Sequence, residues 1–180
     1  MKNKIILFVA SIACMLLMMS CSVSPVVEPG VKVKQIDMTV SVPIHRSSLE
    51  YFDYVLTYQD NNGEKYTDVV TEGEEDVVTY VRTFSYRELP VMCTMTVEMV
   101  PKEGCTSVDA FIFYIPKPYI YPNVYESNAS APDGTDGMDE LAPIHVQPMS
   151  ISEFQDTYGS LFMSACGVYP TDEGYKIINY

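Results

Sequence analysis

Few residues in this 180-residue chain have the types and spacing that catalysis or metal binding requires. The only two histidines, His45 and His145, lie far apart in loop-like sequence, and no zinc-ligand spacing surrounds them. Asp133, Asp136 and Asp139 carry the carboxylate oxygens that Ca²⁺ prefers, but their spacing departs from that of an EF-hand loop. We therefore expect a solvated acidic loop there, with a calcium site as the weaker alternative, and we expect no cofactor.

Nucleophilic catalysis has no motif to support it. The sequence contains no G-x-S-x-G elbow, P-loop or G-x-G-x-x-G run, and no pattern surrounds Cys93, Cys105 or Cys166. These three cysteines allow at most one disulfide among themselves. A Cys93–Cys105 bond is disfavoured because the two residues would lie at opposite ends of one hairpin. A Cys105–Cys166 bond stays open, and three reduced thiols are the preferred interpretation. The sequence thus predicts a protein that is not an enzyme.

A group of tyrosines is the candidate for ligand contact. Tyr119, Tyr121 and Tyr125 lie close together in the sequence, and their rings could stack on sugar rings or on a partner protein. Tyrosines at the rim of a β-sandwich also cover the ends of its sheets, and the chain has no tryptophan, the residue that most favours a glycan site. Ligand binding and simple coverage of the sheet therefore both remain as hypotheses.

The charge of the chain argues against two classes of partner. Acidic residues number 24 and basic residues 11, which gives a net charge of -13. This balance disfavours nucleic acids and anionic lipid head groups as partners. Frequent Val, Ile, Thr, Tyr and Phe, interrupted by Pro and Gly, favour strands over helices.

Alternating apolar residues predict six strands before residue 116. These strands cover 31–42, 49–58, the arm that follows Asn62–Gly63, 77–86, 92–100 and 109–115. The first should contain a bulge near Lys34–Gln35 and end at Pro43. The last is apolar on both faces, which is typical of the centre of a sheet.

The sequence Asn62–Gly63 predicts a two-residue type I′ hairpin turn. A turn centred on this pair places Asp60 opposite Lys65, Tyr58 opposite Thr67, and Leu56 opposite Val69.

The second half of the chain is less regular. Residues 119–148 are rich in Pro, Gly, Asn and Ser, and we expect a long irregular segment there. A short helix should begin with Ser152 as its N-cap and end at Gly159, followed by strands over 161–169 and 174–179. Residues 31–180 are therefore predicted to form one mainly β domain, a single antiparallel two-sheet β-sandwich with one short helix near the C-terminus.

The N-terminus has the features of a targeting signal. Lys2 and Lys4 precede an apolar run over residues 5–19 that leads to Ser20 and Cys21. The run is shorter than the roughly 20 apolar residues that a spanning helix needs. Residues 1–20 resemble a bacterial lipoprotein signal peptide. The resemblance implies that Cys21 is acylated and begins the mature protein, and that residues 21–30 form a spacer. An ordinary secretory signal cleaved near Ser22 is the alternative.

The arrangement of signal, spacer and β domain resembles that of small outer-membrane lipoproteins of Gram-negative gut anaerobes, whose domains are immunoglobulin-like or transthyretin-like. The resemblance implies a lipid-anchored protein of the outer membrane, on a face that the sequence leaves open. Its bilayer partner would be reached through acylated Cys21, and its domain would be a non-enzymatic binding or structural module. One alternative is a pilus-type subunit that polymerises by strand exchange after cleavage at Arg46, and another is a glycan-binding accessory lipoprotein.

Overall fold

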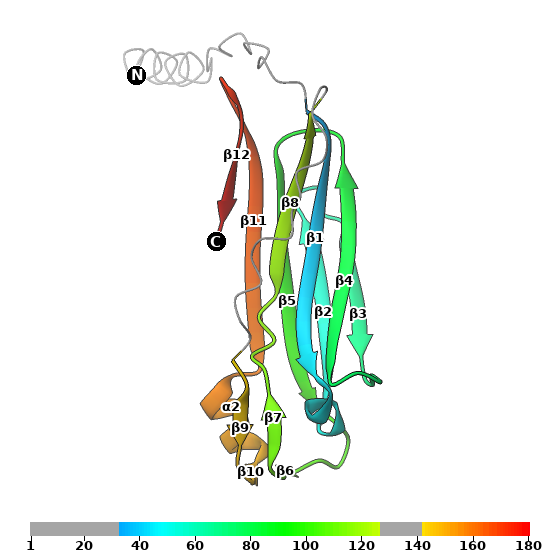
Figure 1. Cartoon of the computed structure of the whole chain (residues 1–180), viewed down its shortest axis with the longest axis vertical. Helices are drawn as coiled ribbons and strands as arrows, with labels where there is room; N and C mark the ends of the chain where they lie inside the picture. Colours follow the sequence, from blue (N-terminus) through cyan, green and yellow to red (C-terminus); the bar gives the residue numbers. More distant parts are fainter. Residues whose placement is uncertain (1–32, 127–141) are drawn as a thin grey trace, which may run out of the picture.

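The computed structural model describes residues 33–126 and 142–180 of the chain. Two antiparallel sheets face each other along most of the length of the molecule (Figure 1). The smaller has the strand order β4-β1-β8 and consists of β1 (Val33–His45), β4 (Val77–Tyr86) and β8 (Tyr119–Glu126). The larger has the order β12-β11-β5-β2-β3 and consists of β2 (Phe52–Asp60), β3 (Lys65–Val70), β5 (Val91–Pro101), β11 (Leu161–Thr171) and β12 (Gly174–Asn179). The predicted mainly β sandwich is confirmed.

The two ends of the sandwich differ. One end, here called the base, carries short elements: the 3-10 helix η1 (Arg46–Glu50), β6 (Ser107–Val108), β7 (Phe111–Phe113), β9 (Ile144–Val146), β10 (Met149–Ser150) and helix α2 (Ile151–Tyr158). The other end, here called the hairpin end, carries the β2–β3 turn (61–64) and the β4–β5 turn (87–90). Strand β1 also begins there, since Ile36 lies opposite Tyr86.

The core lies between the two sheets and follows the predicted alternation. On β1, every second side chain is fully buried: Ile36, Met38, Val40, Val42 and Ile44. On β5, Cys93, Met95, Val97 and Met99 are buried in the same way, as predicted for this strand. The predicted bulge near Lys34–Gln35 is confirmed by a register shift between β1 and β8 at that point.

Helix α2 closes the base of the sandwich. The ring of Phe154 is fully buried and lies 4.9 Å from Phe52 and 5.3 Å from Phe113, measured between ring centroids. The helix ends at Gly159, which has a positive φ of 85°, as predicted. Its N-cap is Ser150 rather than the predicted Ser152, because the Ser150 hydroxyl accepts the Glu153 N–H at 3.2 Å.

Pro43 does not end β1, contrary to the prediction. The Arg46 N–H, just beyond β1, donates to the Asp76 carbonyl at 2.8 Å on the β4 side. Backbone amides alternate in direction along a strand. The amides of even-numbered β1 residues therefore point toward β4, and those of odd-numbered residues point toward β8. Strand β8 pairs no further along β1 than Ser41. The missing N–H of Pro43 therefore faces a side where no described strand pairs with β1, and proline is tolerated at such a position.

The segment 119–148 is not irregular throughout. Its first eight residues form β8, and Pro122 fits there because β8 is an edge strand of its sheet. Residues Ile144–Val146 form β9. The calcium candidates Asp133, Asp136 and Asp139 lie outside the described residues.

The segment 109–115 is not the central strand of a sheet. Only Phe111–Phe113 form a strand, β7, and it pairs with β9 in a two-stranded sheet at the base. The segment is apolar on both faces for another reason: Phe111 and Phe113 pack against Phe154, and Ile112 is half-buried beside η1, where its carbonyl accepts the Ser47 hydroxyl at 2.9 Å.

The β2–β3 hairpin has a different register from the one predicted. Its turn is one residue longer, because the Asp60 carboxylate accepts the N–H groups of Asn62 and Glu64 at 2.9 and 3.0 Å and Gly63 takes a positive φ of 85°. Tyr58 therefore lies opposite Tyr66 and not opposite Thr67. A shift of one residue exchanges the two faces of a strand. As a result, Tyr66 and Asp68 of β3 turn toward the opposite sheet.

Candidate functional site

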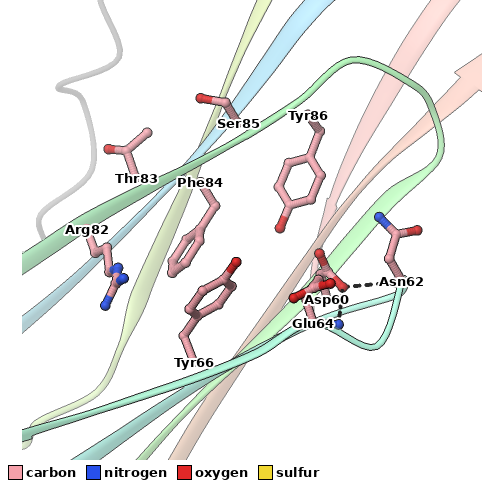
Figure 2. Close-up of a pocket in the computed structure, with 9 residues that line it drawn as sticks. All are labelled: Asp60, Asn62, Glu64, Tyr66, Arg82, Thr83, Phe84, Ser85 and Tyr86. Carbon is pink, nitrogen blue, oxygen red and sulfur yellow. Dashed lines mark hydrogen bonds between the residues drawn. The ribbon is translucent and has the colours of Figure 1, made fainter.

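A cleft opens at the hairpin end between the edge strands of the two sheets, β3 and β4 (Figure 2). Its volume is about 460 Å³. We call it the hairpin-end cleft, and its lining residues are Asp60, Asn62, Glu64, Tyr66, Arg82, Thr83, Phe84, Ser85 and Tyr86. The alternation of β4 and the observed register of β3 bring the aromatic members of this set together.

The wall of the cleft is aromatic. The ring of Phe84 stacks on Tyr58 with 3.8 Å between the centroids, and the ring of Tyr66 tilts against Phe84 at 5.0 Å. Behind them the hydroxyls of Tyr58 and Tyr86 are 2.7 Å apart and share a hydrogen bond. Burial raises the pKa of both tyrosines, so both remain neutral at physiological pH. The wall is therefore rigid and presents ring surface to the cleft.

The rim of the cleft is acidic. Asp60 is only 7% exposed and is held by the two turn amides, whereas Glu64 is exposed. The Asp60 carboxylate also lies close enough to Tyr86 to add to the rise in the pKa of that residue, after the effect of burial. The Asn62 side chain lies on the same turn (Figure 2). The rim thus combines two carboxylates and an amide.

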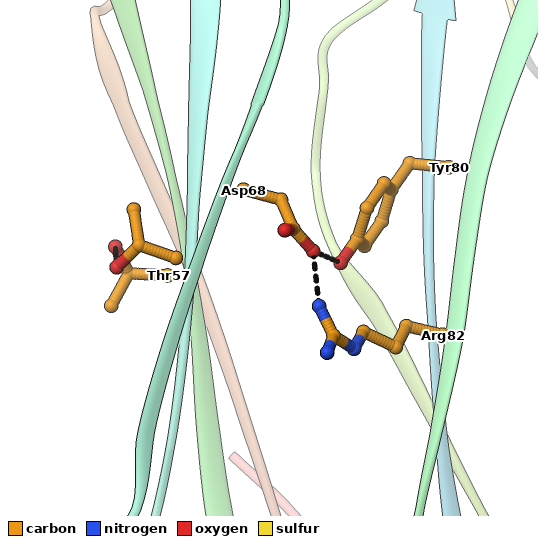
Figure 3. A network of polar contacts seen from close by, with 5 residues as sticks. Thr57, Asp68, Tyr80 and Arg82 are labelled. Atoms are coloured by element: carbon orange, nitrogen blue, oxygen red, sulfur yellow. Dashed lines mark hydrogen bonds and ion pairs between the residues drawn. The ribbon is translucent and has the colours of Figure 1, made fainter.

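Arg82 closes the side of the cleft that runs toward the base. Its guanidinium bonds the Asp68 carboxylate at 2.5 Å, and the Tyr80 hydroxyl donates to the same oxygen (Figure 3). The hydrogen bond from Tyr80, followed by that from Arg82, holds the pKa of Asp68 below its ordinary value. The guanidinium carbon also lies 5.2 Å from the centroid of the Tyr66 ring. Arg82 therefore links the two sheets, and the Asp68 carboxylate balances its charge.

Two further cavities adjoin the cleft. One has a volume of about 500 Å³ and extends over the 87–90 turn, and it shares Asn62, Ser85 and Tyr86 with the cleft. The other has a volume of about 230 Å³ and shares Asp60. The Asn61 side chain ties the two turns together, because it accepts the Met92 N–H at 2.9 Å and donates to the Pro90 carbonyl at 3.3 Å. The hairpin end is therefore a braced, concave surface.

The three tyrosines predicted as a ligand platform lie on one face of β8. Ile120 and Val124 point into the core, so Tyr119, Tyr121 and Tyr125 lie on the opposite, outer face. The rings of Tyr119 and Tyr121 are parallel to within 7° at a centroid distance of 6.3 Å. Tyr125 is further along the strand, where the hydrogen bond of its hydroxyl to the carboxylate of Asp37 raises the pKa of the tyrosine. Their role in ligand binding stays a prediction.

Metal ligands are not gathered in the part of the chain that the structure describes. Residues 33–126 and 142–180 contain no group of three or more His, Cys, Asp and Glu side chains that could hold a metal ion. His45 bonds the Ser47 hydroxyl at 2.7 Å through Nδ1 and caps η1. His145 lies on β9 opposite Ile112.

Cys93 and Cys166 are brought together by the fold, a pairing that sequence reasoning did not consider. They lie directly opposite each other on β5 and β11, and both are buried. The Met99 N–H donates to the carbonyl of Ser160, the residue opposite it. Hydrogen-bonded pairs recur at every second residue of an antiparallel ladder, and Cys93 is six residues from Met99. Cys93 and Cys166 therefore also form a hydrogen-bonded pair. Cβ atoms at such pairs are about 5.5 Å apart, which exceeds the ~3.8 Å of a disulfide.

The described cysteines are all free, and this answers the question left open about Cys105 and Cys166. Cys105 lies in the turn after β5 with its thiol on the Ser107 carbonyl at 3.3 Å, whereas Cys166 lies within the core.

We expect Cys105 to be the only one of the three that reacts with Ellman's reagent in the folded protein. Burial raises the pKa of Cys93 to about 11 and that of Cys166 to about 12, so both are protonated and shielded. In denaturant all three should react. In a Cys14→Ala/Cys21→Ala protein, which carries no thiols besides these three, Cys105→Ala should abolish the native reaction. Peptide mapping that finds a Cys93–Cys166 disulfide would contradict the ladder geometry.

Comparison of the chain with protein-family models, with curated proteins and with solved structures found no match. The candidate site therefore rests on geometry alone. Within the described residues, no helix is both long enough and apolar enough to span a bilayer.

Sequence analysis did not single out the residues of the hairpin-end cleft. Two signals for it were present: the alternating aromatic face of 77–86 and the Asn62–Gly63 turn. The predicted register turned Tyr66 and Asp68 to the outside, which concealed their contact with β4.

Proposed function

We propose that this protein is a lipoprotein of the Gram-negative outer membrane that is anchored through acylated Cys21 and presents its β-sandwich as a non-enzymatic binding module. The observation that carries the binding role is the concave hairpin end, where two braced turns border three adjoining cavities. The anchoring role is supported by the resemblance of residues 1–20 to a lipoprotein signal peptide.

The proposed contact surface lies at the end of the sandwich where the described part of β1 begins. Strand β1 begins with Val33 at the hairpin end. The chain from Cys21 to Val33 can span at most about 43 Å. Acylation of Cys21 would therefore keep the start of β1 within this distance of the bilayer surface, and the hairpin-end cleft lies beside that start, since Ile36 is opposite Tyr86. The cleft would meet ligands that occur close to the membrane.

Acylation is tested by expressing the full chain in a Gram-negative host. We expect the wild-type protein to partition into the detergent phase of Triton X-114 and its N-terminal peptide to carry a diacylglyceryl mass on Cys21. Cys21→Ala should move the protein to the aqueous phase, whereas Cys105→Ala, a matched change in a surface turn, should not. An unmodified wild-type N-terminal peptide would refute the anchor.

The binding role is tested in the same host with a photo-crosslinking residue. Placed at Asn62 in the hairpin end, it should yield adducts of raised mass, and placed at Glu103 in the turn at the base it should not. Both positions are exposed, so they are matched in access. Adducts at both positions or at neither would contradict a binding surface at the hairpin end.

Strand exchange in a pilus-type subunit is the second candidate, and the position of β1 favours it. This strand lies in the middle of its sheet and buries five side chains completely, so cleavage after Arg46 and release of β1 would open a groove between β4 and β8. Arg46, however, is held in η1, where its side chain bonds the Glu74 carbonyl at 3.1 Å. The detergent extracts used for the acylation test separate the two candidates: ladders in unheated gels support strand exchange, and a single monomer band supports the binding module.

A further inference from the structure

We infer that the hairpin-end cleft is a saccharide site that takes a neutral or amino sugar with adjacent hydroxyl groups. The inference rests on the proposed binding function and names the chemistry of the ligand. It concerns a different surface from Tyr119, Tyr121 and Tyr125, and it follows from three properties of the cleft: exposed ring surface, acceptor groups and charge.

Exposed ring surface is supplied by Tyr66. The residue is 38% exposed although its ring packs against Phe84, and the ring borders the cleft (Figure 2). Phe84 is itself fixed from behind by the stacked ring of Tyr58. A pyranose ring has one face of C–H groups, and such a face packs well on a fixed aromatic ring. A fixed ring loses little conformational freedom when a ligand binds.

Hydrogen-bonding groups surround this ring. Asp60 is only 7% exposed, and its carboxylate already accepts the two turn amides and lies against the Tyr86 hydroxyl, so it fixes the turn and adds negative charge to the rim. Glu64 is exposed on the same turn, and the Asn62 amide offers both a donor and an acceptor. Adjacent sugar hydroxyls donate to carboxylates and accept from amides. The rim therefore matches the hydroxyl pattern of a sugar.

The charge of the cleft disfavours acidic ligands. Asp60 and Glu64 are negative, and the guanidinium of Arg82 is engaged by Asp68 at 2.5 Å. The chain as a whole carries a net charge of -13. Sulfated sugars, uronic acids and phosphorylated sugars would thus be repelled, while neutral and amino sugars would not.

The size of the cavities favours more than one sugar unit. The cleft of about 460 Å³ falls within the usual range of small-molecule sites, about 300–1,000 Å³. The adjoining cavity of about 500 Å³ shares Asn62, Ser85 and Tyr86 with it, so an oligosaccharide could continue over the 87–90 turn. The same chemistry occurs in free oligosaccharides and in the head groups of glycolipids, and the experiment distinguishes these sources.

The test applies the detergent-solubilised full-length protein to an array of neutral, amino and sulfated oligosaccharides, followed by calorimetry with the strongest binder. We expect binding to a neutral or amino oligosaccharide and none to dextran sulfate. Tyr66→Ala should weaken binding by about tenfold. Glu64→Gln, at an exposed turn position where misfolding is not a concern, should weaken it by about fivefold. Val69→Ala, on the outer face of the same strand, should leave the affinity unchanged.

The source of the ligand is resolved with vesicles that carry a glycolipid with the same head group. Tighter binding to the vesicles than to the free oligosaccharide identifies a membrane-linked ligand, and equal binding identifies a soluble one. The inference is overturned if no neutral or amino sugar binds, if the sulfated polymer binds best, or if Tyr66→Ala and Glu64→Gln leave the affinity unchanged. Crosslinked adducts at Asn62 without sugar binding would overturn the saccharide inference. They would leave the proposed binding function in place, with a protein partner as the ligand.

Discussion

Replacing Phe154 with alanine is expected to lower the free energy of unfolding by about 3–5 kcal/mol. The ring is fully buried and packs against Phe52, Phe111 and Phe113 at centroid distances of 4.9, 5.8 and 5.3 Å. Its loss removes apolar contacts and leaves a cavity that the surrounding rings cannot easily fill, since Phe52 is held by β2 of the larger sheet and Phe111 and Phe113 are held by β7 of the base. Urea denaturation followed by circular dichroism measures the change.

A matched substitution separates burial from hydrophobicity. Leu161 begins β11, close to α2 in the sequence, but is 65% exposed, and Leu161→Ala should change the free energy of unfolding by less than about 0.5 kcal/mol. A loss below about 1 kcal/mol for Phe154→Ala would mean that α2 does not close the base of the core in solution.

Alkaline pH is expected to destabilise the protein strongly. Burial raises the pKa of Cys93 from 9.0 to about 11 and that of Cys166 from 9.0 to about 12. Above pH 9 the unfolded chain therefore loses protons that the folded protein keeps, so the free energy of unfolding falls as the pH rises. The fall is about 1.4 kcal/mol per pH unit for each thiol, and it ends near the folded pKa values. Below pH 9 these groups contribute no pH dependence.

Two buried tyrosines extend this effect to higher pH. Burial also raises the pKa of Tyr54 and Tyr58 above the ordinary value of 10.0, so their contribution begins about one pH unit above that of the thiols. Urea midpoints at pH 7, 8, 9 and 10 should be constant at first and then decline. In a Cys93→Ala/Cys166→Ala protein the decline between pH 9 and 10 should be shallower. An equal decline in both proteins would rule out the thiols as its cause.

The fold class could be predicted from the sequence because its signal is local. Alternation over 77–86 and 92–100 buries one face of each strand, and the structure confirms both strands to within one residue at each end. The end of α2 at Gly159 was predictable for the same reason, since a glycine with positive φ terminates a helix through its own conformation. Its start was misplaced by two residues because Ser150 and Ser152 are equally good caps in isolation. Burial of Ile151 and Phe154 decides between them.

The hairpin-end cleft could not be predicted because it depends on pairing between distant segments. Residues Asn62 and Gly63 are compatible with turns of two or three residues, and the choice depends on the Asp60 carboxylate and its two amide bonds. That single residue of difference turns Tyr66 and Asp68 toward β4 instead of toward solvent. The contact between Asp68 and Arg82 then joins two sheets that the sequence does not relate.

By itself the sequence determined an acidic, mainly β domain, because charge and alternation are properties of adjacent residues. Only the tertiary structure decided which edges of the sandwich meet, which cysteines face each other, and where an aromatic and acidic cleft opens. These features arise from strand order and register, which depend on contacts between residues far apart in the chain.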